Sequence, residues 1–480
     1  MLKVDVDKVN SLKYIRQLRA VGRWIEAGAK GSITASTGFG KSFMGLLAII
    51  KLKKKVPNAK CLIVVPSLAL KVQWEEHINR LEIVNCVVLV INSVALKERT
   101  LNVDLLILDE EHLYLADQFV QVFTKVSYKW IMGLTATRER LDGRHTLLDK
   151  WLPVVDVITK KECIEKGWIT DLIRINLAVK LSSRERTDME ELDKQVRWYL
   201  DKFQDYKLMQ ACKDPSNAKL YAGQYLPNED IEQATKKVVG WAMYGDKLIR
   251  RRKEFLYTTQ HKIDAAVKIV NTIKLKTIMF GESTEFANVV AEKIGPRAVS
   301  YHSNIKSEMR LSVKTKSFKR LDAAERFRDK VGGELKEEKG VYVVCHQIPE
   351  KFGSDRIKKE ALDCFKRNDC GIDVIVTARA LNVGFDDMTV ELGVDSSRTR
   401  DPGASDQKRG RLSRTYTYRD GTKKRGVYIC LYIPDTQDEK WLRESQKNDV
   451  PGTVWLDSMS QVITYLKEEL NGVNMGFADN

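Results

Sequence analysis

The chain has 480 residues, which is too long for one hydrophobic core and predicts two or three domains. Lysine and arginine number 81 against 65 aspartates and glutamates, so the formal net charge is +16. A surplus of this size favours a polyanionic partner, most simply a nucleic acid, although a merely soluble basic protein would also show it. No run of 18 apolar residues and no signal-peptide core occurs, which argues against membrane-spanning and secreted classes and predicts a soluble, intracellular protein.

The first informative segment is residues 35–42, Ala-Ser-Thr-Gly-Phe-Gly-Lys-Ser, between a short apolar run and a helical-looking stretch. This is the strand–loop–helix context of a phosphate-binding loop. Gly38 and Gly40 would let backbone N–H groups wrap around a phosphate. Lys41 would reach the β- and γ-phosphates, and the Ser42 hydroxyl would bind Mg²⁺. Because alanine replaces the usual first glycine, an ordinary glycine-bearing turn before a helix is the alternative for this segment alone.

An acidic segment, Asp-Glu-Glu-His at residues 109–112, follows an apolar run over 103–108 that is typical of a buried strand. Asp109 at the strand tip would hold Mg²⁺ through water, and Glu110 would orient and deprotonate an attacking water. A solvated acidic turn would look similar in isolation. It is not expected downstream of a phosphate-binding loop, with another apolar strand at 61–65 between the two. Together the segments predict a site that binds and hydrolyses ATP with Mg²⁺.

Short apolar strands alternate with amphipathic helices in two parts of the chain, 1–165 and 271–435. This rhythm predicts the α/β class, with a parallel sheet covered on both faces in each part. The expected strands are 61–65, 87–91, 103–108 and 130–134 in the first lobe, and 277–280, 341–345, 373–377, 390–394 and 427–433 in the second.

Residues 166–270 have a different composition, with apolar residues at helical spacing among many charges, and predict a mainly helical linker or insert. This region contains the consecutive cations Arg250, Arg251, Arg252 and Lys253, which would form either a solvated helix face or a contact with phosphates.

A second, basic insert is expected at 304–356 within the later lobe. We expect a basic helix over 306–330, then a turn and a β-rich run over 341–345 that Pro349 ends. The tail, 436–480, is expected to be a helical extension, capped at Asp457 or Ser458.

The eight cysteines are scattered without a C-x-x-C pair, and the six histidines offer no matching ligand cluster. We therefore expect reduced thiols rather than a zinc site or a disulfide framework.

Five further segments occur in a characteristic order, and with the two above they resemble the motor core of superfamily 2 helicases over residues 10–180 and 270–435. The segment at 134–143 and the acidic box are most similar to the branch that contains XPB, UvsW and RecG, and size and layout resemble phage T5-type branch-migration helicases. The resemblance implies two RecA-like lobes. The five segments are 65–70 (Val-Pro-Ser-Leu-Ala-Leu), 133–137 (Gly-Leu-Thr-Ala-Thr), 280–283 (Phe-Gly-Glu-Ser), 376–386 (Val-Thr-Ala-Arg-Ala-Leu-Asn-Val-Gly-Phe-Asp) and 407–414 (Gln-Lys-Arg-Gly-Arg-Leu-Ser-Arg).

The resemblance implies that ATP lies between the lobes and that both lobes contribute charge. Arg411 and Arg414, one helical turn apart, would supply cations for the developing γ-phosphate charge, with a buried structural pair as the alternative. Gly384 and Asp386 would lie near the nucleotide. Gln17 would read the adenine, although a lone glutamine on a helix is usually a surface residue.

The resemblance also implies contacts with the DNA backbone and residues that couple ATP state to DNA grip. The implied DNA contacts are Pro66, Ser67 and Thr377, and the implied coupling residues are Thr135, Thr137 and Gln407. The sequence departs from the family at Lys408, where many relatives carry arginine, and at Arg138, where a proline is common.

These observations predict an ATP-dependent DNA helicase or translocase that acts on single-stranded, forked or branched DNA in replication, recombination or repair. If the chain is phage-encoded, it would work in the cytoplasm of a bacterial host. The alternatives are a DEAD-box-like RNA helicase, a double-strand translocase subunit of a restriction or remodelling assembly, and a non-hydrolysing scaffold. The acidic box weighs against the first of these, and intact Lys41, Asp109 and Glu110 weigh against the last.

Overall fold

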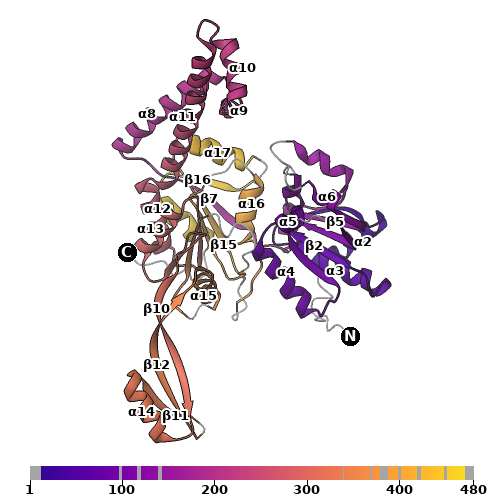
Figure 1. Ribbon diagram of the computed structural model, residues 1–480, viewed down its shortest axis with the longest axis vertical. Helices are drawn as coiled ribbons and strands as arrows, with labels where there is room; N and C mark the ends of the chain where they lie inside the picture. Colours follow the sequence, from indigo (N-terminus) through magenta and orange to yellow (C-terminus); the bar gives the residue numbers. More distant parts are fainter. Residues whose placement is uncertain are drawn as a thin grey trace.

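Two α/β lobes lie side by side, a group of helices projects from one end of the second lobe, and a long β-ribbon projects from its other end (Figure 1). No helix in the described part of the chain is long and apolar enough to cross a membrane. The computed structural model describes residues 12–96, 100–115, 120–138, 143–338, 340–367, 370–378, 387–397, 402–418, 423–447 and 451–470.

The first lobe contains a six-stranded sheet with the order β3-β2-β4-β5-β1-β6, in which all neighbouring strands are parallel. Successive apolar residues pack on opposite faces, so Ile63 and Ile107 join one core while Leu62 and Leu106 join the other. The strands are β1 (Lys30–Ala35), β2 (Cys61–Val65), β3 (Cys86–Val90), β4 (Leu101–Asp109), β5 (Val126–Thr135) and β6 (Val154–Ile158). The helices are α2 (Leu12–Glu26), α3 (Lys41–Lys55), α4 (Leu68–Arg80), α5 (Ile91–Ala95), η1 (Glu111–Leu115), α6 (Val122–Lys125), η2 (Arg144–Lys150) and α7 (Lys160–Glu165).

The second lobe contains a seven-stranded parallel sheet with the order β16-β7-β15-β14-β8-β13-β9. Two cores cover its faces, so the predicted α/β class with two parallel-sheet lobes is confirmed. The strands are β7 (Leu172–Ala178), β8 (Thr277–Gly281), β9 (Ala298–Tyr301), β13 (Val374–Ala378), β14 (Leu392–Asp395), β15 (Gly426–Tyr432) and β16 (Thr453–Leu456). The helices are α12 (Gln260–Thr272), α13 (Thr284–Ile294), α15 (Ser354–Arg367), α16 (Pro402–Gly410), α17 (Gln437–Ser445) and α18 (Met459–Glu469).

Two strands of this sheet lie outside the residues expected for the second lobe. β7 falls in the expected helical linker, and β16 falls in the expected helical tail. Arg174 and Asn176 interrupt the apolar pattern of β7, but each makes a hydrogen bond to a distant part of the chain. Arg174 Nη2 donates to Pro451 O at 2.9 Å, and Asn176 Nδ2 donates to Gln446 Oε1 at 2.9 Å. The helices after β7 are therefore an insertion into the second lobe and not a linker between the lobes.

The helical insertion packs around a small core of its own. Its longest helix, α11, has 28 residues and is about 42 Å long at roughly 1.5 Å per residue. The helices are α8 (Ser183–Phe203), α9 (Tyr206–Ala211), α10 (Pro215–Tyr225) and α11 (Ile231–Thr258).

The β-ribbon, which we call the arm, is a three-stranded antiparallel sheet with the order β10-β12-β11 and one helix. The helix expected over 306–330 is wrong for its first half, because residues 308–313 alternate between polar and apolar types and the whole segment 308–318 forms a strand. The run 341–345 belongs to this sheet and not to the lobe. The elements are β10 (Glu308–Phe318), α14 (Leu321–Val331), β11 (Glu334–Glu338) and β12 (Val341–Phe352).

Pro349 does not end β12, which continues to Phe352 and pairs with the whole of β10. β11 pairs only with residues 341–345 of β12, so β12 is an edge strand where Pro349 lies. A proline without an N–H donor is tolerated on such an edge.

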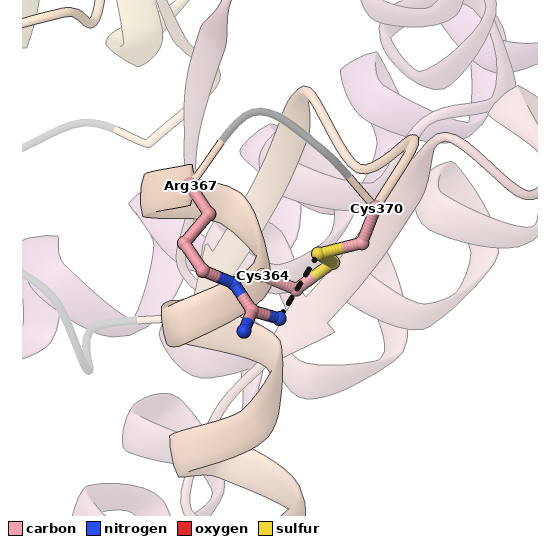
Figure 2. Close-up of a disulfide and its surroundings, with 3 residues drawn as sticks. All are labelled: Cys364, Arg367 and Cys370. Atoms are coloured by element: carbon pink, nitrogen blue, oxygen red, sulfur yellow. Dashed lines mark hydrogen bonds between the residues drawn. A yellow bond between two sulfur atoms is a disulfide. The ribbon is translucent and has the colours of Figure 1, made fainter. Parts of the chain in front are cut away.

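The expectation that all eight cysteines are reduced is wrong for one pair. Cys364 of α15 and Cys370 form a disulfide, and Arg367 Nη2 donates to Cys370 Sγ at 3.4 Å (Figure 2). The end of α15 brings the two Cα atoms to 5.6 Å, a proximity that their spacing in the sequence does not reveal. The other six cysteines are free thiols.

The second lobe contains a buried ion pair that supplies a stability test. Lys262 Nζ of α12 lies 2.7 Å from Asp438 Oδ2 of α17, and both side chains are 0% exposed. Lys262→Met should lower the free energy of unfolding by about 3–5 kcal/mol, because a carboxylate is then left buried without its cation. The double variant Lys262→Met/Asp438→Leu should recover most of this loss. Thermal unfolding of both proteins checks this, and equal losses would contradict the ion-pair interpretation.

Candidate active site

The phosphate-binding loop connects the end of β1 to the start of α3. Gly38 has φ of +86° and Gly40 has φ of +102°, in the left-handed region that favours glycine. A Cβ at position 40 would also lie 2.7 Å from Gln17 Nε2. Both glycines are therefore required by the shape of this loop.

Helix α2 holds the loop from behind. Gln17 Nε2 donates to Phe39 O at 2.8 Å, so Gln17 is buried against the loop and not a surface residue. Lys13 Nζ donates to Gly38 O at 3.2 Å and to Trp168 O at 3.0 Å, and burial lowers the pKa of Lys13 to about 8. This role of Lys13 could not be predicted from its local sequence, because a lysine on an amphipathic helix is ordinarily exposed.

The acidic box begins where β4 ends. Lys41 Nζ lies 3.4 Å from Glu110 Oε1, and Trp74 Nε1 of α4 donates to Asp109 Oδ2 at 2.8 Å. Glu110 has φ of +53°, a left-handed conformation that is uncommon for a residue with a side chain. The strained turn places the two carboxylates and the lysine together.

The pKa values of the two carboxyl groups are shifted in opposite directions. Burial raises the pKa of Asp109, and the neighbouring Glu110 raises it further. Burial also opposes ionisation of Glu110, but the Lys41 ammonium, followed by His112 and Arg411, outweighs it and lowers the pKa. Glu110 Oε2 is buried and accepts no hydrogen bond from the described residues. Glu110 is therefore an ionised base with a spare acceptor.

A cavity of about 230 Å³ lies between the lobes and brings most of the predicted ATP residues together. The first lobe contributes the loop, α4 and the acidic box, and the second contributes the end of α16 and the segment after it. The expectation that Arg411 and Arg414 share a helix is wrong, because α16 ends at Gly410, yet both still line the cavity. The predicted residues in its wall are Gly38, Gly40, Lys41, Ser42, Asp109, Glu110, Gln407, Arg411 and Arg414.

The lobes touch directly beside this cavity. A Cβ at Gly410 would lie 2.0 Å from Thr37 Cγ2 of the phosphate-binding loop, so only glycine permits the approach. Thr170 N donates to Ser413 O at 2.8 Å across the same boundary.

A hydrogen-bond chain leads from the acidic box to the segment after β5. Thr135 Oγ1 donates its one proton to Thr137 O at 2.8 Å, so His112 Nδ1, which is 2.9 Å from Thr135 Oγ1, must be the donor in that contact. His112 Nδ1 is also 3.7 Å from Glu110 Oε2. The two threonines predicted to couple ATP state to DNA grip are thus connected to the carboxylate expected to activate water.

A second connection, which we call the Glu111–Arg138 pair, runs parallel to the first. Glu111 Oε1 accepts from Ser32 Oγ at 2.6 Å and from Arg138 Nη1 at 3.2 Å, and the Glu111 side chain is fully buried. Arg138 Nη2 also donates to Asp149 Oδ1 and to Leu152 O, both at 2.7 Å. Arg138 therefore fastens the segment after β5 to the acidic box and to η2, which a proline at this position cannot do.

The predicted DNA contacts are not gathered in one place. Ser67 accepts from Leu70 N at 3.3 Å as the N-cap of α4, immediately after Pro66. Thr377 is completely buried in β13. Arg250, Arg251 and Arg252 lie on α11 in the helical insertion.

Two of these arginines already have acidic partners. Arg250 Nη2 lies 2.7 Å from Asp246 Oδ2, and Arg252 Nη1 donates to Asp193 Oδ1 at 2.9 Å with its side chain only 12% exposed. Arg252 is therefore a packing residue of the insertion. Arg251 is exposed and, among the described residues, has no carboxylate within ion-pair distance to offset its charge.

The remaining predictions concern the second lobe. Lys408, which stands where many relatives carry arginine, is buried, and its Nζ lies 3.4 Å from Asp395 Oδ1, while Tyr428 Oη donates to Asp395 Oδ2 at 2.8 Å. The Lys408 ammonium therefore pairs with a buried carboxylate inside the second lobe. Gly384 and Asp386 lie outside the described residues.

Helix α4 contributes cavity residues that the sequence analysis missed. Leu70, Gln73 and His77 line the cavity together with Phe43 of α3. Their spacing of three and four residues places the α4 residues on one helix face, which was the signal available in the sequence. Trp74 of the same helix holds Asp109, and nothing local predicts that contact.

The donor set fits a magnesium-bound triphosphate. The start of α3 offers backbone N–H groups and Lys41 for phosphate oxygens, while Ser42 and Asp109 offer the oxygen ligands that Mg²⁺ prefers. Lys41 and the backbone N–H groups that would bind phosphate oxygens therefore lie in one wall of the cavity.

The Glu111–Arg138 pair predicts a specific loss in a variant. Arg138→Ala should lower the free energy of unfolding by about 3–5 kcal/mol, because the Glu111 carboxyl remains buried without its cation. The double variant Glu111→Leu/Arg138→Leu should be closer to wild type, since neither charge is then buried. Thermal unfolding checks this. Equal destabilisation of the two variants would contradict a coupled pair.

Comparisons with known proteins agree with this geometry. Residues 11–90 match the family described as type III restriction enzyme, res subunit. The chain is 26% identical over 211 residues to the DNA 3'-5' translocase XPB2 of Sulfurisphaera tokodaii. The matched region covers 40% of this chain and 46% of the relative. The chain thus spans about half the length of the curated relative it matches.

The two-lobed fold also occurs in a solved structure. Dbp5 of S. cerevisiae, bound to RNA and ADP BeF3, superposes with a TM-score of 0.51 at 14% identity, over 95% of this chain and 93% of that chain. The Hef helicase domain of Pyrococcus furiosus gives a TM-score of 0.49 at 15% identity, over 90% and 97% of the two chains. The order of the motifs, the matched sequences and the two-lobed fold support the resemblance to superfamily 2 helicases and translocases.

Proposed function

We propose that this chain is an ATP-dependent DNA helicase or translocase that acts on forked or branched DNA. The observation that carries the proposal is the cavity between the lobes. One wall holds Lys41, Asp109 and Glu110, and the opposite wall holds Arg411 and Arg414. A site divided in this way is complete only when the lobes close, which ties hydrolysis to a movement between them.

Bound Mg-ATP would supply the phosphoanhydride bond and the metal charge. The N–H groups of the loop and Lys41 would hold the phosphates, and Ser42 and Asp109 would hold the metal. Glu110 accepts the proton of the attacking water, because it is ionised and Oε2 has a spare acceptor. Arg411 and Arg414 offset the charge that develops on the γ-phosphate, an effect of about 10³–10⁵ in rate in comparable systems.

His112 lies within ion-pair distance of Glu110 and is hydrogen-bonded to Thr135, which in turn donates to Thr137 O, and this arrangement supports coupling between hydrolysis and DNA grip. A change of charge at Glu110 alters the partner of His112 and thereby the segment after β5. This segment lies at the carboxyl edge of the sheet, where the strand ends of a parallel sheet ordinarily meet ligands.

The net charge of +16 favours a polyanionic substrate, and the relative with matched sequence is named as a DNA translocase. We therefore propose DNA as the substrate. ATP turnover measured with DNA and RNA strands of equal length tests this choice, since stimulation by RNA alone would favour the RNA helicase.

The arm supports action on forked DNA. It projects from the second lobe as a ribbon about 36 Å long, at roughly 3.3 Å per residue over the 11 residues of β10 (Figure 1). Tyr342 lies near its distal end, next to the turn between β11 and β12. There the Tyr342 ring would stack on the first unpaired base of a fork. Phe352 is 6% exposed, and the Arg356 guanidinium lies 3.7 Å from its ring, so Phe352 is a packing residue at the base of the arm.

The catalytic assignment predicts that Glu110→Gln binds Mg-ATP but hydrolyses it very slowly, since an amide cannot accept the proton of the water. Lys41→Ala should also abolish turnover, by weakening contact with the phosphates. Steady-state turnover with saturating DNA and nucleotide binding at equilibrium provide the measurements. Turnover of Lys41→Ala within about threefold of wild type, roughly 0.7 kcal/mol, would show that the loop assignment is wrong.

The arm predicts a separation between ATP turnover and unwinding. Replacing residues 309–351 by a short Gly/Ser linker keeps the paired ends Glu308 and Phe352, so the lobe should retain its fold. Turnover stimulated by single strands should persist, whereas unwinding of a forked duplex should fall sharply. Wild-type unwinding by this variant would exclude the arm as the separating element. A wild-type protein that leaves the fork paired would instead support the double-strand translocase.

A further inference from the structure

One face of α11 is exposed along most of its length. The other face packs on α8, α9 and α10 through Ala234, Val238, Ala242 and Leu248. The exposed residues recur every three or four positions, as expected for a single helix face. We call this face the outer stripe, and its main members are Lys236, Met243, Tyr244, Lys247, Arg250 and Arg251.

The outer stripe carries positive charge that the insertion does not neutralise. Among the described residues, Lys236, Lys247 and Arg251 have no carboxylate within ion-pair distance, whereas Arg252, on another face, pairs with Asp193. Lys247 and Arg251 are about 6 Å apart along the helix axis, and Lys236 is about 16 Å from Lys247, at roughly 1.5 Å per residue. The exposed acidic residues of α11, Glu232 and Glu254, lie towards its two ends.

Exposed aromatic rings lie on the same helix as these cations and on the neighbouring α8. Trp198 of α8 is 50% exposed and Tyr244 is 49% exposed, and Tyr199 connects them with ring-centroid distances of 4.6 Å and 5.5 Å. Lys202 Nζ lies 4.0 Å from the Trp198 ring and 4.3 Å from the Trp241 ring. Large aromatic side chains left half-exposed beside free cations commonly mark a binding surface.

We propose that the outer stripe, with Trp198, binds single-stranded nucleic acid outside the motor core. Lys236, Lys247 and Arg251 neutralise phosphates, and the rings of Trp198 and Tyr244 stack on bases. Rings stack only on bases that are unpaired, which favours a single strand over a duplex. Three unneutralised cations within one exposed face favour a polyanion over a protein partner.

This inference rests on the proposed function, because it assumes that the chain handles a nucleic acid. It adds a surface on the helical insertion, which projects away from both lobes and shares no residue with the ATP cavity (Figure 1). Variants of the stripe should therefore leave ATP turnover without nucleic acid unchanged.

The test uses full-length protein and a long thymidine homopolymer strand, which forms no duplex. The charge variant is Lys247→Gln/Arg251→Gln, and its matched control is Lys207→Gln/Lys219→Gln, which removes the same charge from exposed positions on α9 and α10. The ring variant is Trp198→Ala/Tyr244→Ala, and Trp198→Phe/Tyr244→Phe is its conservative rescue.

The charge variant should reduce the slope of log affinity against log salt by about 1.4, from about 0.7 for each lost phosphate contact of a single strand. The ring variant should bind the strand at least about fivefold more weakly, while the phenylalanine variant should bind nearly as wild type. Duplex binding should respond to the charge variant alone.

Two results would overturn the inference. The first is a charge variant with the same slope as its control, and the second is a ring variant that binds the strand as tightly as wild type. A ring variant that weakens duplex and single-strand binding equally would contradict stacking. Failure of the proposed function is distinguishable, because the wild-type protein would then show no ATP turnover stimulated by any nucleic acid.

Discussion

The contact between Thr37 of the phosphate-binding loop and Gly410 of the second lobe is the constraint on which the candidate site depends. A side chain at position 410 would overlap Thr37, so glycine is needed for the lobes to approach. The same approach brings Arg411 and Arg414 to the wall opposite Lys41 and completes the cavity. A charged triphosphate requires cations on several sides, which a single sheet edge does not supply.

Buried polar groups inside the first lobe hold the acidic box in a strained conformation. Glu110 has a positive φ, and its neighbours are fixed by Trp74, which donates to Asp109, and by Arg138, which pairs with Glu111. A buried ion pair contributes little net stability but specifies one arrangement of the elements it connects. In this chain that arrangement joins the end of β4 to the segment after β5, which is where hydrolysis and nucleic-acid grip would communicate.

Both additions to the motor fold belong to the second lobe. The helical insertion enters between β7 and α12, and the arm enters between β9 and α15, at opposite ends of the lobe (Figure 1). Their chemistry differs, because the insertion presents cations beside half-exposed rings, while Tyr342 near the arm's tip is its candidate for stacking. Under the proposed function, the two additions would offer different contacts to a nucleic-acid strand.

The fold class could be predicted from the amino-acid sequence, and the proposed chemistry of the site follows from it as well, because a phosphate loop and a carboxylate box need particular residues next to apolar strands. Lys41 and Asp109 can therefore be proposed as site residues from the local sequence pattern. The strand β7 could not be predicted in the same way, because Arg174 and Asn176 interrupt its apolar pattern and find their hydrogen-bond partners about 270 residues away. Three features became visible only in the folded protein, because each depends on groups distant in the chain. They are the end of α16 before Arg411, the contact of Trp74 with Asp109 and the pairing of β10.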